Sequence, residues 1–175
     1  MSGAADAGIG EKQEDIISCR RTRSMHYVTC DIHNDNEKFN ALLKKLDLSE
    51  HDHLIILGDL FDRSSSAPDP VGVYFNVLKL EKRCTVIRGN HDQWLAEYII
   101  NYYRTPERKR ARMELYPYNT FELLLQRLTF VDMQNLANWI LSWPVQVEFE
   151  LENEKYLLAH ATTSIPEEQK MRITI

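Results

Sequence analysis

The sequence predicts an α/β fold in which helices connect parallel strands. Three short apolar segments, at 25–30, 54–57 and 84–87, alternate with two stretches of helical periodicity. Strands that are separated by helices pair in parallel through right-handed crossovers. The chain has 175 residues, 43% hydrophobic and 27% charged, so it is long enough for one domain with a core. We assign this domain to residues 25–175 and treat residues 1–24, which lack apolar periodicity, as a flexible tail.

The elements of the first half follow from the hydrophobic pattern. Segment 25–30 is expected to be a short strand. An amphipathic helix comes next, because apolar residues recur at i, i+3, i+4 and i+7 after a run of candidate N-caps. The apolar positions are Phe39, Leu42, Leu43 and Leu46, and the candidate caps are Asn34, Asp35 and Asn36. A strand at 54–57, a Ser- and Pro-rich loop at 64–70 and a helix at 71–83 lead to the third strand at 84–87.

The second half is predicted to be helical first and then to form strands. Helices are expected at 94–103 and 121–128, and a third is marked by Val131, Met133, Leu136, Ala137, Ile140 and Leu141. Trp139 and Trp143 are explained most simply as packing residues, and the basic stretch 104–112 as a solvated helical face rather than a docking patch for phosphoproteins. After Pro144, apolar and polar residues alternate, and a turn at 152–154 precedes a strand that leads into His160.

Charge and composition argue against several classes of protein. The formal net charge is -5, whereas a dedicated nucleic-acid-binding domain is usually basic. No apolar run approaches the ~20 residues that span a bilayer, and the N-terminus has no apolar signal region. The three cysteines form neither a CxxC pair nor an even framework. We therefore expect a cytoplasmic protein with no nucleic-acid or membrane partner, and the oligomeric state stays open.

Polar side chains follow each of the first three strands. The first strand ends in DIH at 31–33, the second in GDLFDR at 58–63 and the third in GNHD at 89–92. Open α/β sheets place their sites at the carboxyl ends of the strands. Any one of these segments alone is more simply a turn, and a lone histidine is more often a buried core residue. Three in order are hard to explain by packing, so together they predict a metal site.

The residue types at these strand ends are metal ligands. Asp31 and His33 lie two apart in an extended segment and can point to the same ion. Asp59 can bridge two ions with its two oxygens, Asn90 offers an amide oxygen, and His160 offers an imidazole after a later strand. Mixed oxygen and nitrogen ligands favour manganese, iron or zinc over a structural Cys-type zinc site.

The segments DIHN, GDLFDR, GNHD and LLAHA resemble the ordered signature of the calcineurin-like metallophosphoesterases. The combination of GD-x-x-DR with GNH is similar to the bacterial serine/threonine phosphoprotein phosphatase branch. This resemblance runs from about 25 to 169 and implies a β-sandwich flanked by helices. It implies two divalent metal ions. We expect both to be manganese, with iron or zinc as alternatives. By resemblance, Asp31 and His33 bind the first ion, Asn90 and His160 bind the second, and Asp59 bridges both.

The resemblance also implies the groups that act on the substrate. His91 would be the general acid, held by Asp62, and Arg63 with Asn90 would bind the phosphate. The chain departs from the family pattern where glycine is usual, and Asn34 is the substitute best able to adopt the positive φ that glycine allows there. The other departures are Ser64, Asp92 and Thr162. The family has a further segment after the residue at 160 that carries another metal-binding histidine, so we expect the last strands to be missing and the second metal site to be weakened.

Three functions are consistent with these motifs. The first is a metal-dependent serine/threonine protein phosphatase that hydrolyses phosphomonoesters of a phosphorylated protein. The second is a hydrolase of dinucleotide polyphosphates or other small phosphoesters. The third is an inactive remnant that binds a metal or a partner. The GDLFDR and GNHD motifs favour the first two, but they serve the phosphoryl group and do not distinguish its leaving groups.

Overall fold

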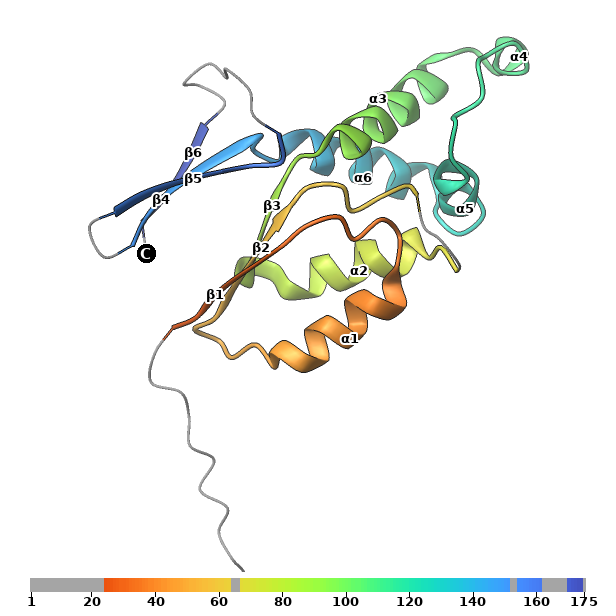
Figure 1. Cartoon of the computed structure of the whole chain (residues 1–175). Helices are drawn as coiled ribbons and strands as arrows, with labels where there is room; N and C mark the ends of the chain where they lie inside the picture. Colours follow the sequence, from red (N-terminus) through yellow and green to blue (C-terminus); the bar gives the residue numbers. More distant parts are fainter. Residues whose placement is uncertain (1–23, 64–66, 152–153, 162–169, 175) are drawn as a thin grey trace, which may run out of the picture.

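The computed structural model describes residues 24–63, 67–151, 154–161 and 170–174. The expected tail therefore lies outside the described residues except for Ser24, whose hydroxyl donates to the carbonyl of His51. The chain forms two three-stranded sheets with helices packed against the first of them (Figure 1). Within the described residues, no helix combines the length and the apolar composition needed to cross a membrane.

The first sheet has the order β1-β2-β3, and both pairings are parallel. Its strands are β1 (His26–Thr29), β2 (His53–Leu57) and β3 (Cys84–Ile87). Helix α1 (Asn36–Leu46) connects the first two strands, and α2 (Pro70–Leu80) connects the second and third. The predicted alternation of strands and helices and the predicted parallel pairing are thus confirmed.

The two connecting helices begin at the side chains that cap them. Asp35 is the N-cap of α1 and accepts a hydrogen bond from the backbone of Lys38, so one of the three predicted caps is used. Asp69 caps α2 in the same way, with proline at the first helical position. The helix predicted to reach residue 83 ends at Leu80, because Glu81 has φ 50°. A short 3₁₀ turn, η1 (Glu81–Arg83), then leads into β3.

The next four helices lie in the upper right part of Figure 1. They are α3 (Asn90–Arg104), α4 (Glu107–Arg110), α5 (Thr120–Leu125) and α6 (Phe130–Ser142), and α3 packs against α6. Trp139 and Trp143 contact each other edge to face, as their packing role predicts. The basic residues of this stretch are exposed except for Arg110, whose Nε donates to the carbonyls of Tyr102 and Thr105.

Two of these helices differ in length from the prediction. Helix α3 begins at Asn90, four residues before the expected start, because the side chain of Asp92 accepts a hydrogen bond from the backbone of Gly89. Asn90 and His91 are therefore helical residues rather than part of a loop after β3. Helix α5 ends at Leu125 instead of residue 128.

The second sheet has the order β5-β4-β6. Strands β4 (Gln146–Leu151) and β5 (Glu154–Ala159) are antiparallel, and β6 (Lys170–Thr174) is parallel to β4. The predicted alternating strand after Pro144 and the strand before His160 are confirmed. Residues 152 and 153 of the predicted turn lie outside the described residues, as do 162–169 and 175.

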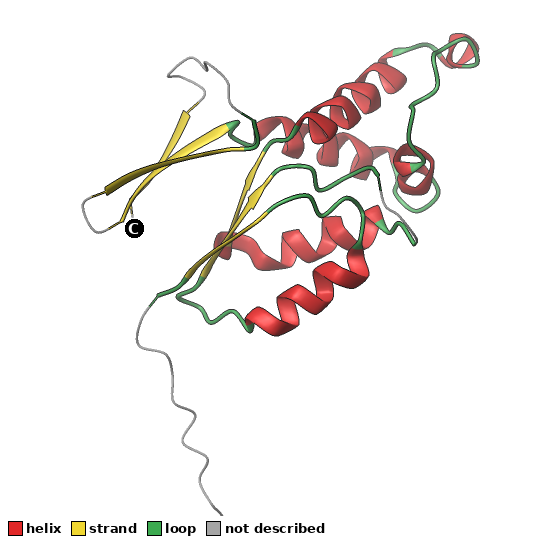
Figure 2. Cartoon of the chain, viewed as in Figure 1, coloured by secondary structure: helices red, strands yellow, loops and turns green. Residues whose placement is uncertain are grey.

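The central strand of the first sheet, β2, is buried on both of its faces. Leu54 and Ile56 of β2 belong to the large core that the helices cover (Figure 2). Ile55 and Ile87 point to the opposite face and pack against Val147 of β4. The two sheets therefore contact each other through this small apolar cluster, and helices cover the other face of the first sheet. The predicted α/β fold is confirmed, with helices described on the outside of the first sheet.

Truncation of Ile55 tests this contact between the sheets. Ile55 is 1% exposed, and we expect Ile55→Ala to lower the free energy of unfolding by about 2–5 kcal/mol. Val28, its register partner in β1, is 50% exposed, so Val28→Ala should change stability by less than about 0.5 kcal/mol. Urea unfolding of both variants measures the difference, and equal effects would contradict the packing of the two sheets.

Candidate metal centre

The loops after β1 and β2 lie side by side and bond to each other through their backbones. The N–H groups of Asp31, His33 and Asn34 donate to the carbonyls of Gly58, Asp59 and Leu60 at 3.2, 3.0 and 2.8 Å. These bonds continue the pairing of β1 with β2 beyond the ends of the strands. As a result, side chains from the two loops are brought to the same edge of the sheet.

Both loops have an unusual backbone conformation. Of the nine described residues with positive φ, seven lie in these loops: Asp31, His33, Asn34, Gly58, Asp59, Asp62 and Arg63. Asn34 has φ 62°, as predicted for the position where the family usually has glycine. Strained residues of this kind cost about 1–3 kcal/mol each and persist where the surrounding structure holds them. Their concentration at the ends of two strands marks this edge as a functional site.

The carboxylate of Asp92 holds the loop after β2 in place. It accepts hydrogen bonds from the backbones of Asp59 (2.9 Å), Leu60 (2.9 Å) and Gly89 (3.0 Å), with a longer one from Phe61. Burial raises the pKa of Asp92 to about 6, and the N–H donors oppose this shift. The group is therefore mostly ionised at neutral pH, the state in which it best accepts these bonds. Sequence reasoning missed this role, although an acidic residue at the third position of a helix is a signal for capping.

Two glycines allow the loops to approach closely. A Cβ atom at Gly89 would lie 2.2 Å from Oδ1 of Asp59. A Cβ atom at Gly58 would lie 2.7 Å from the backbone of Gly89 and 2.9 Å from Nδ1 of His160. Only glycine leaves room at these positions for the carboxylate of Asp59 and for the imidazole of His160.

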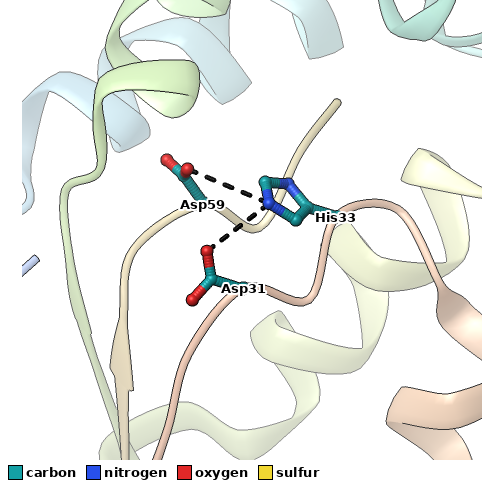
Figure 3. Close-up of side chains that lie close together, drawn as sticks. All are labelled: Asp31, His33 and Asp59. Atoms are coloured by element: carbon teal, nitrogen blue, oxygen red, sulfur yellow. Dashed lines mark ion pairs between the residues drawn. The ribbon is translucent and has the colours of Figure 1, made fainter. Parts of the chain in front are cut away.

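Asp31, His33 and Asp59 form a compact group of possible metal ligands (Figure 3). One ligand atom from each lies within 4.8 Å of the others. Nε2 of His33 is 3.5 Å from Oδ1 of Asp31 and 4.0 Å from Oδ2 of Asp59. His160, which follows β5, places its own Nε2 3.4 Å from the same Oδ2 of Asp59. The predicted ligands of both ions thus meet at Asp59, the predicted bridge.

Backbone carbonyls orient both histidines toward Asp59. Nδ1 of His33 lies 3.1 Å from the carbonyl oxygen of Phe61, and Nδ1 of His160 lies 2.7 Å from that of Leu57. Since a carbonyl only accepts, each ring must carry its proton on Nδ1, which leaves the lone pair of Nε2 free. Histidines that bind metals typically have this second hydrogen bond. The donor set therefore fits divalent cations, with imidazole nitrogens and carboxylate oxygens facing one another.

The other predicted ligands and phosphate-binding groups lie at the edge of this cluster. Asn90 is exposed in the first turn of α3, directly after Gly89. Arg63 is exposed and lines a cavity of about 400 Å³ together with Asp31 and His33. The side chains of the other four predicted ligands lie close to one another. Asn90 is placed near them only by its position directly after Gly89.

His91 and Asp62 form a buried pair next to the ligands. Both side chains are 0% exposed, and Nδ1 of His91 is 3.1 Å from Oδ2 of Asp62. The ring of His91 meets the ring of His33 edge to face at 5.6 Å. Nε2 of His91 is buried and has no hydrogen-bond partner among the described residues, an unusual state for a buried polar atom. The hydroxyl of Tyr116 also donates to Oδ2 of Asp62, a contact across 54 residues of sequence that no local pattern signals.

Comparison with known proteins identifies the family. A family model described as calcineurin-like phosphoesterase matches residues 27–172, and the chain belongs to this family. The family consists of phosphoester hydrolases that bind divalent metals. A solved structure of a hypothetical protein from Pyrococcus horikoshii OT3 is 19% identical, with a TM-score of 0.49. The match covers 76% of this chain and 54% of that chain, so the chain spans about half the length of that protein. No curated protein matches the chain.

The first prediction for the site concerns Asp59. Replacement by asparagine removes the charge that the two histidines face, so Asp59→Asn should abolish stoichiometric binding of Mn²⁺ measured by calorimetry. Asp47→Asn is the matched control, because it removes the same charge from an exposed residue at the C-terminal end of α1, the opposite end of that helix from the ligand loop. Unchanged binding to Asp59→Asn would show that the ligands have been assigned wrongly.

The second prediction concerns Asp92. In Asp92→Asn, an NH₂ group replaces one carboxylate oxygen, so at least one backbone N–H that donates to Asp92 in the wild type loses its acceptor. The lost negative charge also weakens the remaining hydrogen bonds. We expect a loss of about 1.5–3 kcal/mol in the free energy of unfolding, the range for hydrogen bonds to charged groups. Asp132 occupies the same helical position in α6 but is only partly buried, so Asp132→Asn should cost less, about 0.5–1 kcal/mol. Equal losses in urea unfolding would mean that Asp92 acts only as a cap.

Proposed function

We propose that the chain is a metal-dependent phosphoester hydrolase that acts on phosphoserine or phosphothreonine in proteins. The observation that carries this proposal is the convergence of two imidazole Nε2 atoms on one oxygen of Asp59, next to the buried pair of Asp62 and His91. Membership of the phosphoesterase family supports the reaction class. The substrate class and a cytoplasmic location rest on the sequence, whose GDLFDR and GNHD motifs resemble those of bacterial phosphoprotein phosphatases.

The proposed cofactor is a pair of divalent cations, with manganese first and iron or zinc as alternatives. Asp31, His33 and Asp59 would hold one cation, and Asp59, His160 and Asn90 the other. Carboxylate, imidazole and amide donors suit these metals. When bound, such cations supply Lewis acidity toward the phosphoryl group and a water nucleophile at neutral pH.

The side chains around the cations bind the phosphoester and handle its leaving group. The exposed guanidinium of Arg63 can hold two phosphate oxygens in a bidentate fork, and the amide of Asn90 can donate to a third. His91 keeps one proton on Nδ1, toward Asp62, and would give a second proton from Nε2 to the departing alkoxide. The carboxylate of Asp62 stabilises the charged imidazolium that this transfer requires.

A substrate panel separates this proposal from the other two functions. Phosphopeptides, diadenosine tetraphosphate and 4-nitrophenyl phosphate would be assayed with Mn²⁺, because the metal ligands serve the phosphoryl group shared by all three. We expect turnover of phosphopeptides at higher kcat/KM than of the dinucleotide. The reverse preference would assign the chain to small phosphoesters. Binding of Mn²⁺ without turnover of any substrate would assign it to metal binding alone.

Replacement of His91 tests whether this residue acts in proton transfer or in metal binding. His91→Ala should lower kcat by roughly 10²–10⁴-fold, the contribution of a general acid. Its metal content, measured by elemental analysis, should stay at the wild-type level. His33→Ala is the contrasting variant, and it should lose metal along with activity because its Nε2 faces both Asp31 and Asp59. Loss of metal from His91→Ala would instead make His91 a ligand.

A further inference from the structure

The segment Tyr116–Thr120, which we call the strap, contacts the site with every second side chain. It consists of the irregular residues 116–119 and the first residue of α5. The hydroxyl of Tyr116 donates to Oδ2 of Asp62 at 2.6 Å, and the ring of Tyr118 lies 5.1 Å from that of His91. Thr120, the last strap residue, accepts a hydrogen bond from the amide of Asn34 at 2.8 Å.

We infer that Tyr116 is a positioning residue for the pair of Asp62 and His91, and that the strap fixes it there. This inference rests on the proposed function, in which His91 protonates the leaving group. Among the described residues, the hydrogen bond and ring contacts of Tyr116 are to Asp62, Tyr98 and Tyr118, none of which is a proposed metal ligand. It acts on the reaction through Asp62, because its hydrogen bond fixes the orientation of the carboxylate that holds His91.

The hydrogen bonds of Asp62 explain why it depends on Tyr116. Oδ2 of Asp62 faces two groups, the Tyr116 hydroxyl and Nδ1 of His91, whereas the buried Oδ1 has no hydrogen-bond partner among the described residues. A buried carboxylate is costly unless hydrogen bonds satisfy it. The short bond from Tyr116 is of the charge-assisted kind, which is stronger than a neutral one. Without it, one donor alone would hold the carboxylate, which could then rotate away from His91.

The surroundings of Tyr116 fit a fixed position. Tyr116 is 7% exposed, and burial, followed by the bond to Asp62, raises the pKa of its hydroxyl, so the hydroxyl stays protonated and able to donate. At the other end of the strap, Thr120 and Asn34 are both 0% exposed. Asn34 directly follows the ligand His33 and is held by the backbone of Leu60, so the strap is bonded to both loops of the site.

A purely structural role for Tyr116 is the alternative to be tested. Its ring packs 5.0 Å from the ring of Tyr98, and loss of packing would slow every substrate equally. Impaired protonation of the leaving group behaves differently, because it slows only substrates whose leaving group needs a proton. Tyr116→Phe keeps the ring and removes only the hydroxyl, so the two roles can be separated by the choice of substrate.

The kinetic experiment compares phenyl phosphate with 2,4-dinitrophenyl phosphate on the Mn²⁺-loaded chain. Tyr116→Phe should lower kcat about 10-fold for phenyl phosphate, a fraction of the ~10²–10⁴-fold contribution of general acid catalysis. The value for the dinitrophenyl ester, whose leaving group departs without a proton, should be unchanged. Tyr102→Phe is the control, because Tyr102 belongs to the same aromatic cluster and should alter neither value. Equal loss on both esters, or no loss on either, would overturn the inference.

A second measurement does not depend on turnover. Long-range ¹H–¹⁵N spectra of the histidines would be recorded on the Zn²⁺-loaded chain, since Mn²⁺ broadens nearby signals. His91 should show a proton on Nδ1 in the wild type and in Tyr102→Phe, and a shifted or broadened signal in Tyr116→Phe. An identical His91 signal in all three proteins would overturn the inference. If the wild type hydrolyses no phosphoester, the proposed function fails, and the spectra alone decide whether Tyr116 positions the pair.

Discussion

The carboxylate of Asp92 accepts hydrogen bonds from four backbone N–H groups, three in the loop after β2 and one at the start of α3. The group is fully buried, so water cannot replace it as an acceptor. The loop after β2 in turn accepts three backbone hydrogen bonds from the loop after β1. One side chain therefore fixes the position of α3 relative to both loops, and the positive-φ residues in those loops persist because these bonds hold them.

The loop after β2 also orients ligands that belong to other elements. The carbonyl of Phe61 in this loop faces His33, and the carbonyl of Leu57 at its base faces His160. The loop itself contributes Asp59, whose Oδ2 both imidazoles face. A movement of this loop would displace three ligands together, so the ligand set behaves as one unit. Main-chain carbonyls orient the two imidazoles, which leaves the Nε2 atom of each ring free to bind a divalent cation.

The sequence predicted the residues whose place follows from strand order. Asp31, His33 and Asp59 converge because parallel strands end at the same edge of a sheet, and this rule needs no knowledge of tertiary contacts. Apolar periodicity predicts a start of α3 that is four residues too late, because it begins only after the cap that Asp92 provides. Tyr116 and Thr120 could not be predicted, since they reach Asp62 and Asn34 across 54 and 86 residues.

Two separate supports therefore hold the two halves of the proposed chemistry. The proposed metal ligands depend on Asp92 and on backbone carbonyls near the loop after β2. The pair of Asp62 and His91 takes its last hydrogen bond from the strap, which belongs to a later part of the chain. Loss of the Tyr116 hydroxyl should then impair proton transfer while the ligands stay in place. Loss of the Asp92 carboxylate should disturb both, because Asp62 follows Phe61, which Asp92 holds, and the backbone of His91 donates to Asp59, which Asp92 also holds. The catalytic pair therefore depends on the support that holds the ligands, whereas the ligands do not depend on the Tyr116 hydroxyl. This order suits the proposed reaction, because a leaving-group acid is useful only where the phosphoryl group is already bound.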